Sequence, residues 1–237
     1  MKYFKYICNL LFPPHCIFCD EILDFRCDSN VCPTCLNKIT RIDDTRCQLC
    51  FRKTFGNFGM ETCSSCKNNK PHFSGLVSVY EYEKGVRDCI LRLKFHHRFD
   101  HSQAMGDIMA DILPKESSFD YIIAVPISRQ RLFERGYNQS LLLAKSISKR
   151  TGIPIHKNLL VKTKNNKPQS SVERKDRALN VKGVYKVKDN HIIKGKSILL
   201  VDDVSTTRST INECARMLMK AGAYRVDCVT FAVAKEE

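Results

Sequence analysis

The chain has 237 residues, 39 Lys and Arg against 25 Asp and Glu, a formal net charge of +14, and 13 cysteines. An apolar fraction of 43% with 27% charged residues is typical of a globular protein and excludes a chain that is mainly disordered. No run approaches the roughly 18 consecutive apolar residues of a membrane span. The short apolar run that ends at Phe12 is followed by two prolines and has no small-residue cleavage site. We therefore expect no signal peptide and a cytoplasmic protein whose thiols stay reduced.

Eight of the cysteines form a repeat in the first 66 residues. Each half of the repeat reads C-x2-C-x12-C-x2-C, and a shift of 31 residues superimposes the first half on the second. Two such pairs can close one tetrahedral four-sulfur site, so the repeat predicts two zinc ribbons with structural zinc. The predicted ligands are Cys16, Cys19, Cys32 and Cys35 in the first site, and Cys47, Cys50, Cys63 and Cys66 in the second. A thioredoxin-type redox pair is the alternative for Cys32 and Cys35, and four evenly placed pairs argue against it.

The second ribbon contains Phe51, Phe55 and Phe58. These rings could stack on unpaired bases, or they could form the small core that a ribbon otherwise lacks. We favour the core.

A polar junction around residues 67–71 predicts a domain boundary, with a double zinc-ribbon domain at 1–70 and a second domain at 71–237. In the second domain strands alternate with helices, which predicts an α/β fold with a mainly parallel sheet flanked by helices. The predicted strands are 76–82, 121–125, 197–201 and 226–233, and the predicted helices are 86–95, 104–113, 137–147 and 209–221. The polar, basic stretch 162–182 predicts a long mobile loop.

The positive charge is concentrated in one part of the chain. Residues 128–196 carry 18 basic and 4 acidic side chains, a net charge of +14. This asymmetry favours a polyanionic partner, either nucleic acid or a ligand with several phosphates. A solvated basic face is the alternative.

The most informative motif follows the predicted strand 197–201. Asp202 and Asp203 come directly after the strand, a hydroxyl-rich turn follows, and a helix begins at once. The carboxyl end of such a strand is where open α/β sheets bind ligands, and the turn with the first helical N–H groups can hold a phosphate. The carboxylates suit neutral hydroxyls, such as a ribose diol, or a Mg²⁺ ion shared with the ligand. The motif therefore predicts a site for a phosphorylated sugar.

This motif resembles the phosphoribosyl pyrophosphate (PRPP) loop of type I phosphoribosyltransferases, and the whole chain resembles the ComF (ComFC) competence family. The residues that carry the second resemblance are the double ribbon with 11–16 before it, 93–95, Val125, Pro126, Arg131, Leu132, 135–140, Gln169, Arg177, Asn180, Val181 and 221–223.

The resemblance implies a role for individual residues. Asp202 and Asp203 would be the catalytic pair that holds the ribose hydroxyls of Mg²⁺-bound PRPP. The implied PRPP-binding residues are Asp202, Asp203, Ser205, Thr206, Thr207, Arg208, Ser209 and Thr210, and the implied pyrophosphate loop is Pro126, Ile127, Ser128 and Arg129. The implied contacts to phosphates or nucleic acid are Arg131, Arg135, Lys162, Lys164, Lys167, Arg174, Lys175 and Arg177. A flexible loop within 162–180 would close over the site.

One position departs from the family pattern, since Arg208 stands where the family usually has glycine. Glycine there allows the backbone to approach the 5′-phosphate. The arginine could crowd that cradle, or it could add a charged contact to the phosphate. Both possibilities remain open from the sequence.

Other polar residues and cysteines receive structural interpretations. His96, His97 and His101 are expected to be exposed and not to bind metal. Gly136 is expected to help the chain begin a helix. Three isolated cysteines on apolar faces are expected in the core: Cys89, Cys214 and Cys228.

The favoured function is that of a ComF-like competence protein. Such a protein would bind incoming single-stranded DNA in natural transformation, bind PRPP in its transferase-like domain, and contact DNA-uptake or recombination proteins. The alternatives are an active phosphoribosyltransferase in nucleotide metabolism and a PRPP-sensing regulator without enzyme activity.

Overall fold

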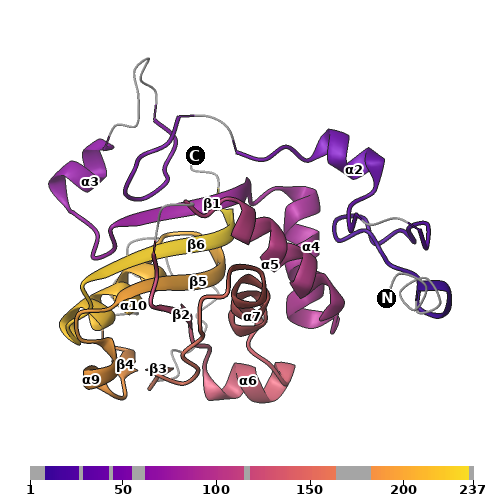
Figure 1. Cartoon of the computed structure of the whole chain (residues 1–237). Coiled ribbons are helices and arrows are strands. Elements are labelled where there is room, and N and C mark those ends of the chain that lie inside the picture. Colours follow the sequence, from indigo (N-terminus) through magenta and orange to yellow (C-terminus); the bar gives the residue numbers. More distant parts are fainter. Residues whose placement is uncertain are drawn as a thin grey trace.

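The structure is a computed structural model that describes residues 9–26, 29–42, 45–54, 62–114, 118–163 and 183–234. Its centre is a four-stranded sheet in the order β1-β6-β5-β2 (Figure 1). The strands are β1 (Gly75–Glu81), β2 (Tyr121–Ala124), β5 (Ser197–Ser205) and β6 (Arg225–Val233). All neighbouring strands are parallel, so their carboxyl ends lie at one edge. Within the described ranges, no helix combines the length and the apolar character needed to traverse a lipid bilayer.

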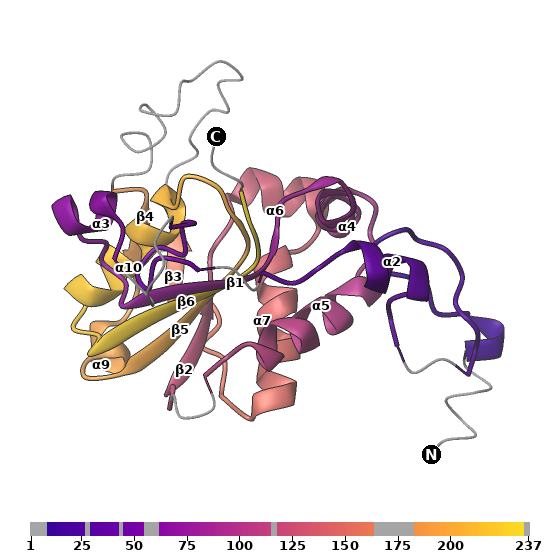
Figure 2. The ribbon, with the colours of Figure 1, turned by 90° about the horizontal axis from the view of Figure 1, so that it is seen from above.

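Helices cover both faces of the sheet, as Figure 2 shows from above. The helices α4 (Lys84–Phe95), α5 (Asp100–Asp111) and α7 (Gln139–Thr151) lie on one face, and α10 (Ser209–Lys220) lies on the other. Successive residues of β5 therefore enter different cores: Leu199 and Val201 pack on the α4–α5–α7 side, and Ile198 and Leu200 on the α10 side. The predicted α/β fold with a parallel, doubly covered sheet is confirmed.

Several short elements were not predicted. They are α6 (Arg129–Arg135), the antiparallel pair β3 (Leu160–Lys162) and β4 (Tyr185–Val187), and α9 (Asn190–Ile193). Helix α6 buries none of its residues, so it has no apolar stripe for a sequence pattern to reveal. Gly136 does not begin a helix as expected; with a φ of 77° it is the left-handed cap that ends α6. The predicted loop 162–182 starts too early, because Lys162 lies in β3 and Thr163 still hydrogen-bonds to Val184, and residues 164–182 lie outside the described residues.

The first ribbon, which contains α2 (Pro33–Lys38), lies beside α4 and α5 (Figures 1 and 2). Phe18 of this ribbon is buried, and its ring centroid lies 5.4 Å from that of Tyr80 and 6.3 Å from that of Phe231. Arg92 of α4 also donates hydrogen bonds to the main-chain oxygens of Ile17 and Phe18. The first ribbon thus shares the core of the α/β part.

The second ribbon, which contains α3 (Ser64–Asn68), lies at the other end of β1, near α10 (Figures 1 and 2). Phe51 is half-buried there and packs against the α10-side core. Phe55 and Phe58 lie outside the described residues. The domain boundary at residue 70 stays a prediction, since both ribbons pack against the larger part of the chain.

His101 corrects one expectation. Its side chain is only 1% exposed, and its Nε2 lies 3.6 Å from Asp20 of the first ribbon and 3.7 Å from Asp100. Burial lowers the pKa of His101 to about 4, so the ring is neutral at physiological pH. The expectation of exposure was wrong because the sequence does not show that the first ribbon covers this part of α5. His96 and His97 are exposed as predicted, and the three isolated cysteines Cys89, Cys214 and Cys228 are buried as predicted.

Candidate functional site

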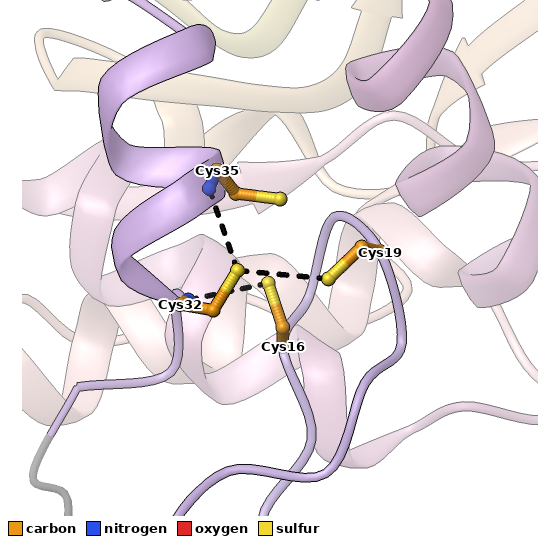
Figure 3. A group of neighbouring side chains, drawn as sticks. All are labelled: Cys16, Cys19, Cys32 and Cys35. Atoms are coloured by element: carbon orange, nitrogen blue, oxygen red, sulfur yellow. Dashed lines mark hydrogen bonds between the residues drawn. The ribbon is translucent and has the colours of Figure 1, made fainter.

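The eight repeat cysteines form two four-sulfur clusters. In each cluster the Sγ atoms all lie within 4.8 Å of one another, and Figure 3 shows the first cluster. The N–H groups of Cys32 and Cys63 donate equivalent hydrogen bonds of 3.4 Å to the Sγ atoms of Cys16 and Cys47. The two halves of the repeat therefore fold in the same way.

The chemistry of both clusters fits zinc. Burial raises the pKa of Cys16 and of Cys47, but main-chain N–H donors outweigh it and bring each pKa down to about 7. A lowered pKa favours the thiolate, which is the form that binds metal. Burial raises the pKa of Cys19 and of Cys50 to about 11, so these thiols would release their protons when the metal binds. Four sulfur ligands and no open position are typical of a structural site. All eight ligands predicted from the spacing lie in these two clusters.

The acidic pair lies at the carboxyl edge of the sheet, inside a strand that is longer than predicted. β2 ends where Ala124 pairs with Val201, whereas β6 continues to pair with β5 as far as Ser205. The predicted end of the strand at 201 is therefore too early. Asp202 and Asp203 extend past the end of β2, and α7 begins beside them.

Asp203 is held by a cation and an amide. Lys94, at the end of α4, forms an ion pair with Oδ2 of Asp203, and the Gln139 side chain donates a 3.2 Å hydrogen bond to Oδ1. Burial raises the pKa of Asp203, but the charge of Lys94 and the hydrogen bonds from Lys94 and Gln139 together outweigh it and leave the pKa below its ordinary value. Asp203 is thus ionised at neutral pH.

Asp202 has a different environment. Ser140 Oγ donates a 2.7 Å hydrogen bond to its Oδ1, and the main-chain N–H of Asp203 donates a 2.9 Å bond to the same oxygen. Burial, and next the negative charge of Asp203, raise the pKa of Asp202 to about 8. The group of Asp202, Asp203 and Lys94 is therefore close to neutral in sum at pH 7.

The run Arg135–Ser140 positions this pair. Gln139 and Ser140 contact the two carboxyl groups directly, and the Arg135 guanidinium donates a 3.1 Å hydrogen bond to Gln139. Asn138 caps α7 by accepting a 3.0 Å bond from the Ser140 N–H, and it donates a 3.0 Å bond to the main-chain oxygen of Val125. Our sequence analysis singled out this run for its resemblance but assigned no contact to Gln139 or Ser140.

Lys94 is a third residue at this site, after Gln139 and Ser140, for which the sequence predicted no contact. It belongs to the 93–95 stretch that carried the resemblance. Its partner is distant in the chain, and only the packing of α4 against the sheet brings the two together. A basic residue at the end of an amphipathic helix is common, so no signal within the sequence would have paired it with Asp203.

The hydroxyl-rich turn contacts the second ribbon. Arg208 adopts a left-handed conformation with a φ of 63°, which explains why glycine suits this position. Its side chain is buried, and its Nε donates a 2.6 Å hydrogen bond to the main-chain oxygen of Cys50. This anchoring role was not among the two that the sequence left open.

The same surface encloses a small cavity. Its volume is about 170 Å³, and its lining includes Arg52 and Lys70 from the ribbon side and Thr207 and Ser209 from the turn. The main-chain N–H of His72 also donates a 2.7 Å bond to the Asn212 side chain of α10. The Arg208 bond therefore joins the turn to the second ribbon, and the His72 bond joins the segment between that ribbon and β1 to α10.

The remaining predicted residues lie around this edge or outside the described parts. In the turn, Ser205 is buried, Thr206 is exposed, and Thr207, Ser209 and Thr210 are half-buried. In the predicted pyrophosphate loop, Pro126 and Ile127 are half-buried, Ser128 caps α6, and Arg129 is exposed as its first residue. Lys164, Lys167, Arg174, Lys175 and Arg177 lie outside the described residues.

Three cations lie close to one another near the pair. Burial, and next the charge of Arg131, lower the pKa of both Arg135 and Lys162. The Lys162 ammonium lies 5.7 Å from the ring centroid of Tyr185, and Arg131 is exposed. Closely spaced cations repel one another, so this group favours a bound anion.

Comparison with known protein families finds a match for each of the two parts of the chain. The family model described as a phosphoribosyl transferase domain matches residues 138–237, and the model described as a double zinc ribbon domain matches residues 7–68. Competence protein ComFC of Bacillus subtilis is 27% identical in an alignment of 225 residues, with 87% of this chain and 89% of that protein covered.

The chain is a homologue of the ComF competence proteins. Competence protein F of Haemophilus influenzae is 28% identical over 171 residues, with 69% of this chain and 75% of that protein covered. The DNA utilization protein YhgH of Escherichia coli K12 is 28% identical over 203 residues, with 83% and 87% covered. Among solved structures, the glutamine PRPP amidotransferase of B. subtilis is similar with a TM-score of 0.42 and 18% identity, over 59% of this chain and 30% of that enzyme.

Proposed function

We propose that this ComF homologue acts in natural transformation, where it binds incoming single-stranded DNA in the cytoplasm and binds Mg²⁺–PRPP at the Asp202–Asp203 pair. The observation that carries the PRPP part is the buried acidic pair, held by Lys94, Gln139 and Ser140 at the carboxyl edge of a parallel sheet. Relatives named for competence and for DNA utilization support the DNA part. DNA-uptake or recombination proteins would be its partners.

Each group at this edge has a role in the proposal. The two carboxyl groups accept hydrogen bonds from the ribose hydroxyls, and the hydroxyls and N–H groups of residues 205–210 hold the 5′-phosphate. The pyrophosphate lies toward residues 126–129, where Arg131 and Arg135 supply positive charge. Bound Mg²⁺ would neutralise the pyrophosphate and share the ribose oxygens with the carboxylates.

The DNA part of the proposal rests on charge. The basic side chains of 128–196 would contact the phosphates of a single strand, so its affinity should fall steeply with salt. The two zinc ribbons would stabilise the fold that presents these basic side chains.

The test measures single-stranded DNA affinity across a salt series, with and without Mg²⁺–PRPP, for the zinc-loaded full chain. We expect salt-dependent DNA binding, and PRPP binding that Asp202→Asn with Asp203→Asn abolishes. The matched control is Asp107→Asn on α5, which changes an acidic side chain remote from the pair. Lack of DNA binding at low salt would overturn the DNA part, and PRPP binding that survives the double substitution would overturn the PRPP site. Release of pyrophosphate in the presence of a base would establish the chain as an active transferase.

A further inference from the structure

Aromatic side chains gather at the carboxyl end of α4. Phe95 and Phe99 are 57% and 45% exposed. The Phe99 ring lies edge-on to that of Tyr137, with centroids 4.6 Å apart, and the His97 ring lies 5.7 Å from Phe99 and 6.3 Å from Tyr137. The Arg135 guanidinium lies 4.7 Å from the centroid of the Phe95 ring. We call these five residues the aromatic ledge: Phe95, His97, Phe99, Tyr137 and Arg135.

The aromatic ledge is attached to the residues that hold the acidic pair. Phe95 follows Lys94, the partner of Asp203, and Arg135 donates to Gln139, which in turn donates to Asp203. The Tyr137 hydroxyl donates a hydrogen bond to the main-chain oxygen of Leu93. The ledge therefore lies at the same edge of the sheet as the candidate phosphoribosyl site.

The exposure of these rings is not explained by the fold. Large aromatic side chains normally bury most of their surface, and a group of them left open to solvent marks a contact site. In the first ribbon Phe18 is 4% exposed, and in the linker before β1 Phe73 is 2% exposed. Those two phenylalanines are buried in the core, so their rings cannot stack on a base.

The chemistry of the ledge fits one kind of ligand. A nucleobase presents a flat π-face that stacks on phenylalanine or on a guanidinium plane, whatever its sequence. Arg135 of the ledge and the neighbouring Arg131 can contact the phosphates that accompany a base. A purely apolar partner would offer no negative group for Arg131 and Arg135 to contact.

We propose that the aromatic ledge stacks an unpaired nucleobase beside the Asp202–Asp203 pair. This inference rests on the proposed function and names where the bases of the bound strand lie. The base can belong to a DNA strand, or it can be a free base or nucleoside, since both present the same π-face.

The experiment uses the zinc-loaded full chain and a double variant, Phe95→Ala with Phe99→Ala. The probes are a short single-stranded oligonucleotide that contains 2-aminopurine and an oligonucleotide of the same length that is abasic at each position. The control variant is Tyr224→Ala, which removes a 75% exposed aromatic ring just before β6, at the opposite edge of the sheet.

We expect the wild type to bind the base-containing strand about tenfold more tightly than the abasic strand and to quench 2-aminopurine. The double variant should lose this preference and the quenching while its salt dependence is unchanged, because the phosphate contacts remain. Tyr224→Ala should behave as wild type. A double variant that keeps the preference and the quenching would overturn the proposal.

Two further measurements distinguish lost base stacking from a folding defect, and a DNA strand from a free base as the ligand. The variant Phe95→Tyr with Phe99→Tyr retains both rings and should restore the preference and the quenching. A general folding defect in the alanine variant would also weaken its binding to the abasic strand, so unchanged binding of that strand excludes such a defect. Quenching of free 2-aminopurine riboside by wild type, lost in the alanine variant, would support a free base as the source. If no strand binds, the DNA part of the proposed function fails. The measurement with 2-aminopurine riboside then tests the aromatic ledge by itself. Quenching of the riboside would support base stacking on the ledge, and a lack of quenching would overturn it.

Discussion

The Nε atom of Arg208 donates a 2.6 Å hydrogen bond to the main-chain oxygen of Cys50. Cys50 is one of the four sulfur ligands in the second cluster, and Arg208 lies in the turn that we assign to the 5′-phosphate. The backbone of a zinc ribbon and the backbone of the candidate phosphate cradle are thus joined through one buried side chain.

Removing the Arg208 side chain should weaken both the second zinc site and the candidate phosphate site. Arg208→Gly keeps the left-handed conformation without strain, so it measures the loss of the buried side chain together with its hydrogen bond to Cys50. We expect faster zinc release from the second cluster, weaker PRPP binding, and a loss of about 1.5–3 kcal/mol of stability, since a charged donor is removed. Zinc release to a chromogenic chelator and PRPP titration measure the first two. Arg150→Ala, which breaks an exposed pair with Asp111, is the control and should change neither. Unchanged zinc release in Arg208→Gly would show that the contact is incidental.

Ser140→Ala should weaken ligand binding without unfolding the chain. The substitution removes the 2.7 Å hydrogen bond to Asp202, which costs about 1–2 kcal/mol for a buried partner. Because that hydroxyl lowers the pKa of Asp202, its loss should raise the pKa further and reduce Mg²⁺–PRPP affinity by about tenfold. Calorimetric titration gives the affinity, and Ser148→Ala on the same helix provides the matched comparison. Equal affinities in the two variants would contradict the role given to Ser140.

The ion pair of Lys94 with Asp203 should show strong coupling in a double-mutant cycle. Lys94→Met leaves a carboxylate that is only 3% exposed without its counter-ion, and we expect a loss of about 3 kcal/mol of stability. Adding Asp203→Asn should recover most of that loss, since the buried charge is then gone. Lys196→Met, which breaks a pair with Asp120 that is 40% and 36% exposed, should cost less than about 1 kcal/mol. Denaturant unfolding is measured for wild type, Lys94→Met, Asp203→Asn and the double variant, with Lys196→Met as a fifth chain. Additive losses at Lys94 and Asp203 would argue against a direct pair.

The raised pKa of Asp202 makes stability depend on pH. The folded chain keeps the Asp202 proton up to about pH 8, whereas the unfolded chain loses it near pH 4. Between those values the folded state binds the extra proton, so its stability falls as the pH rises and the contribution is gone above about pH 8. Asp202→Asn has no proton to lose, so its thermal midpoint should exceed that of wild type by a margin that grows from about pH 4 to about pH 8 and is constant above that. Parallel midpoints for the two chains would contradict the assignment.

The sequence predicted the features that depend on local spacing. The cysteine repeat identified all eight sulfur ligands, and alternation of apolar strands with amphipathic helices identified the four strands of the sheet. Both patterns work because a ligand pair or a buried strand places constraints on neighbouring residues.

The features that the sequence did not predict depend on contacts between distant segments. The end of β5 at Ser205 depends on pairing with β6, and the burial of His101 depends on Asp20 in the first ribbon. Arg208 was recognised as unusual, yet its partner in the second ribbon could not be inferred. Helix α6 was missed because it buries nothing.

Phe18 also has a consequence for how the chain can be divided. Its ring packs against both Tyr80 and Phe231, whose own centroids lie 5.1 Å apart, so a fragment that starts after the ribbons would expose one face of this aromatic cluster to water. Metal loss from the first cluster should therefore be visible as a drop in the melting temperature of the entire chain, in a single cooperative transition. A chelator would act on this protein as a denaturant of its sheet, although no metal ligand belongs to any strand of that sheet.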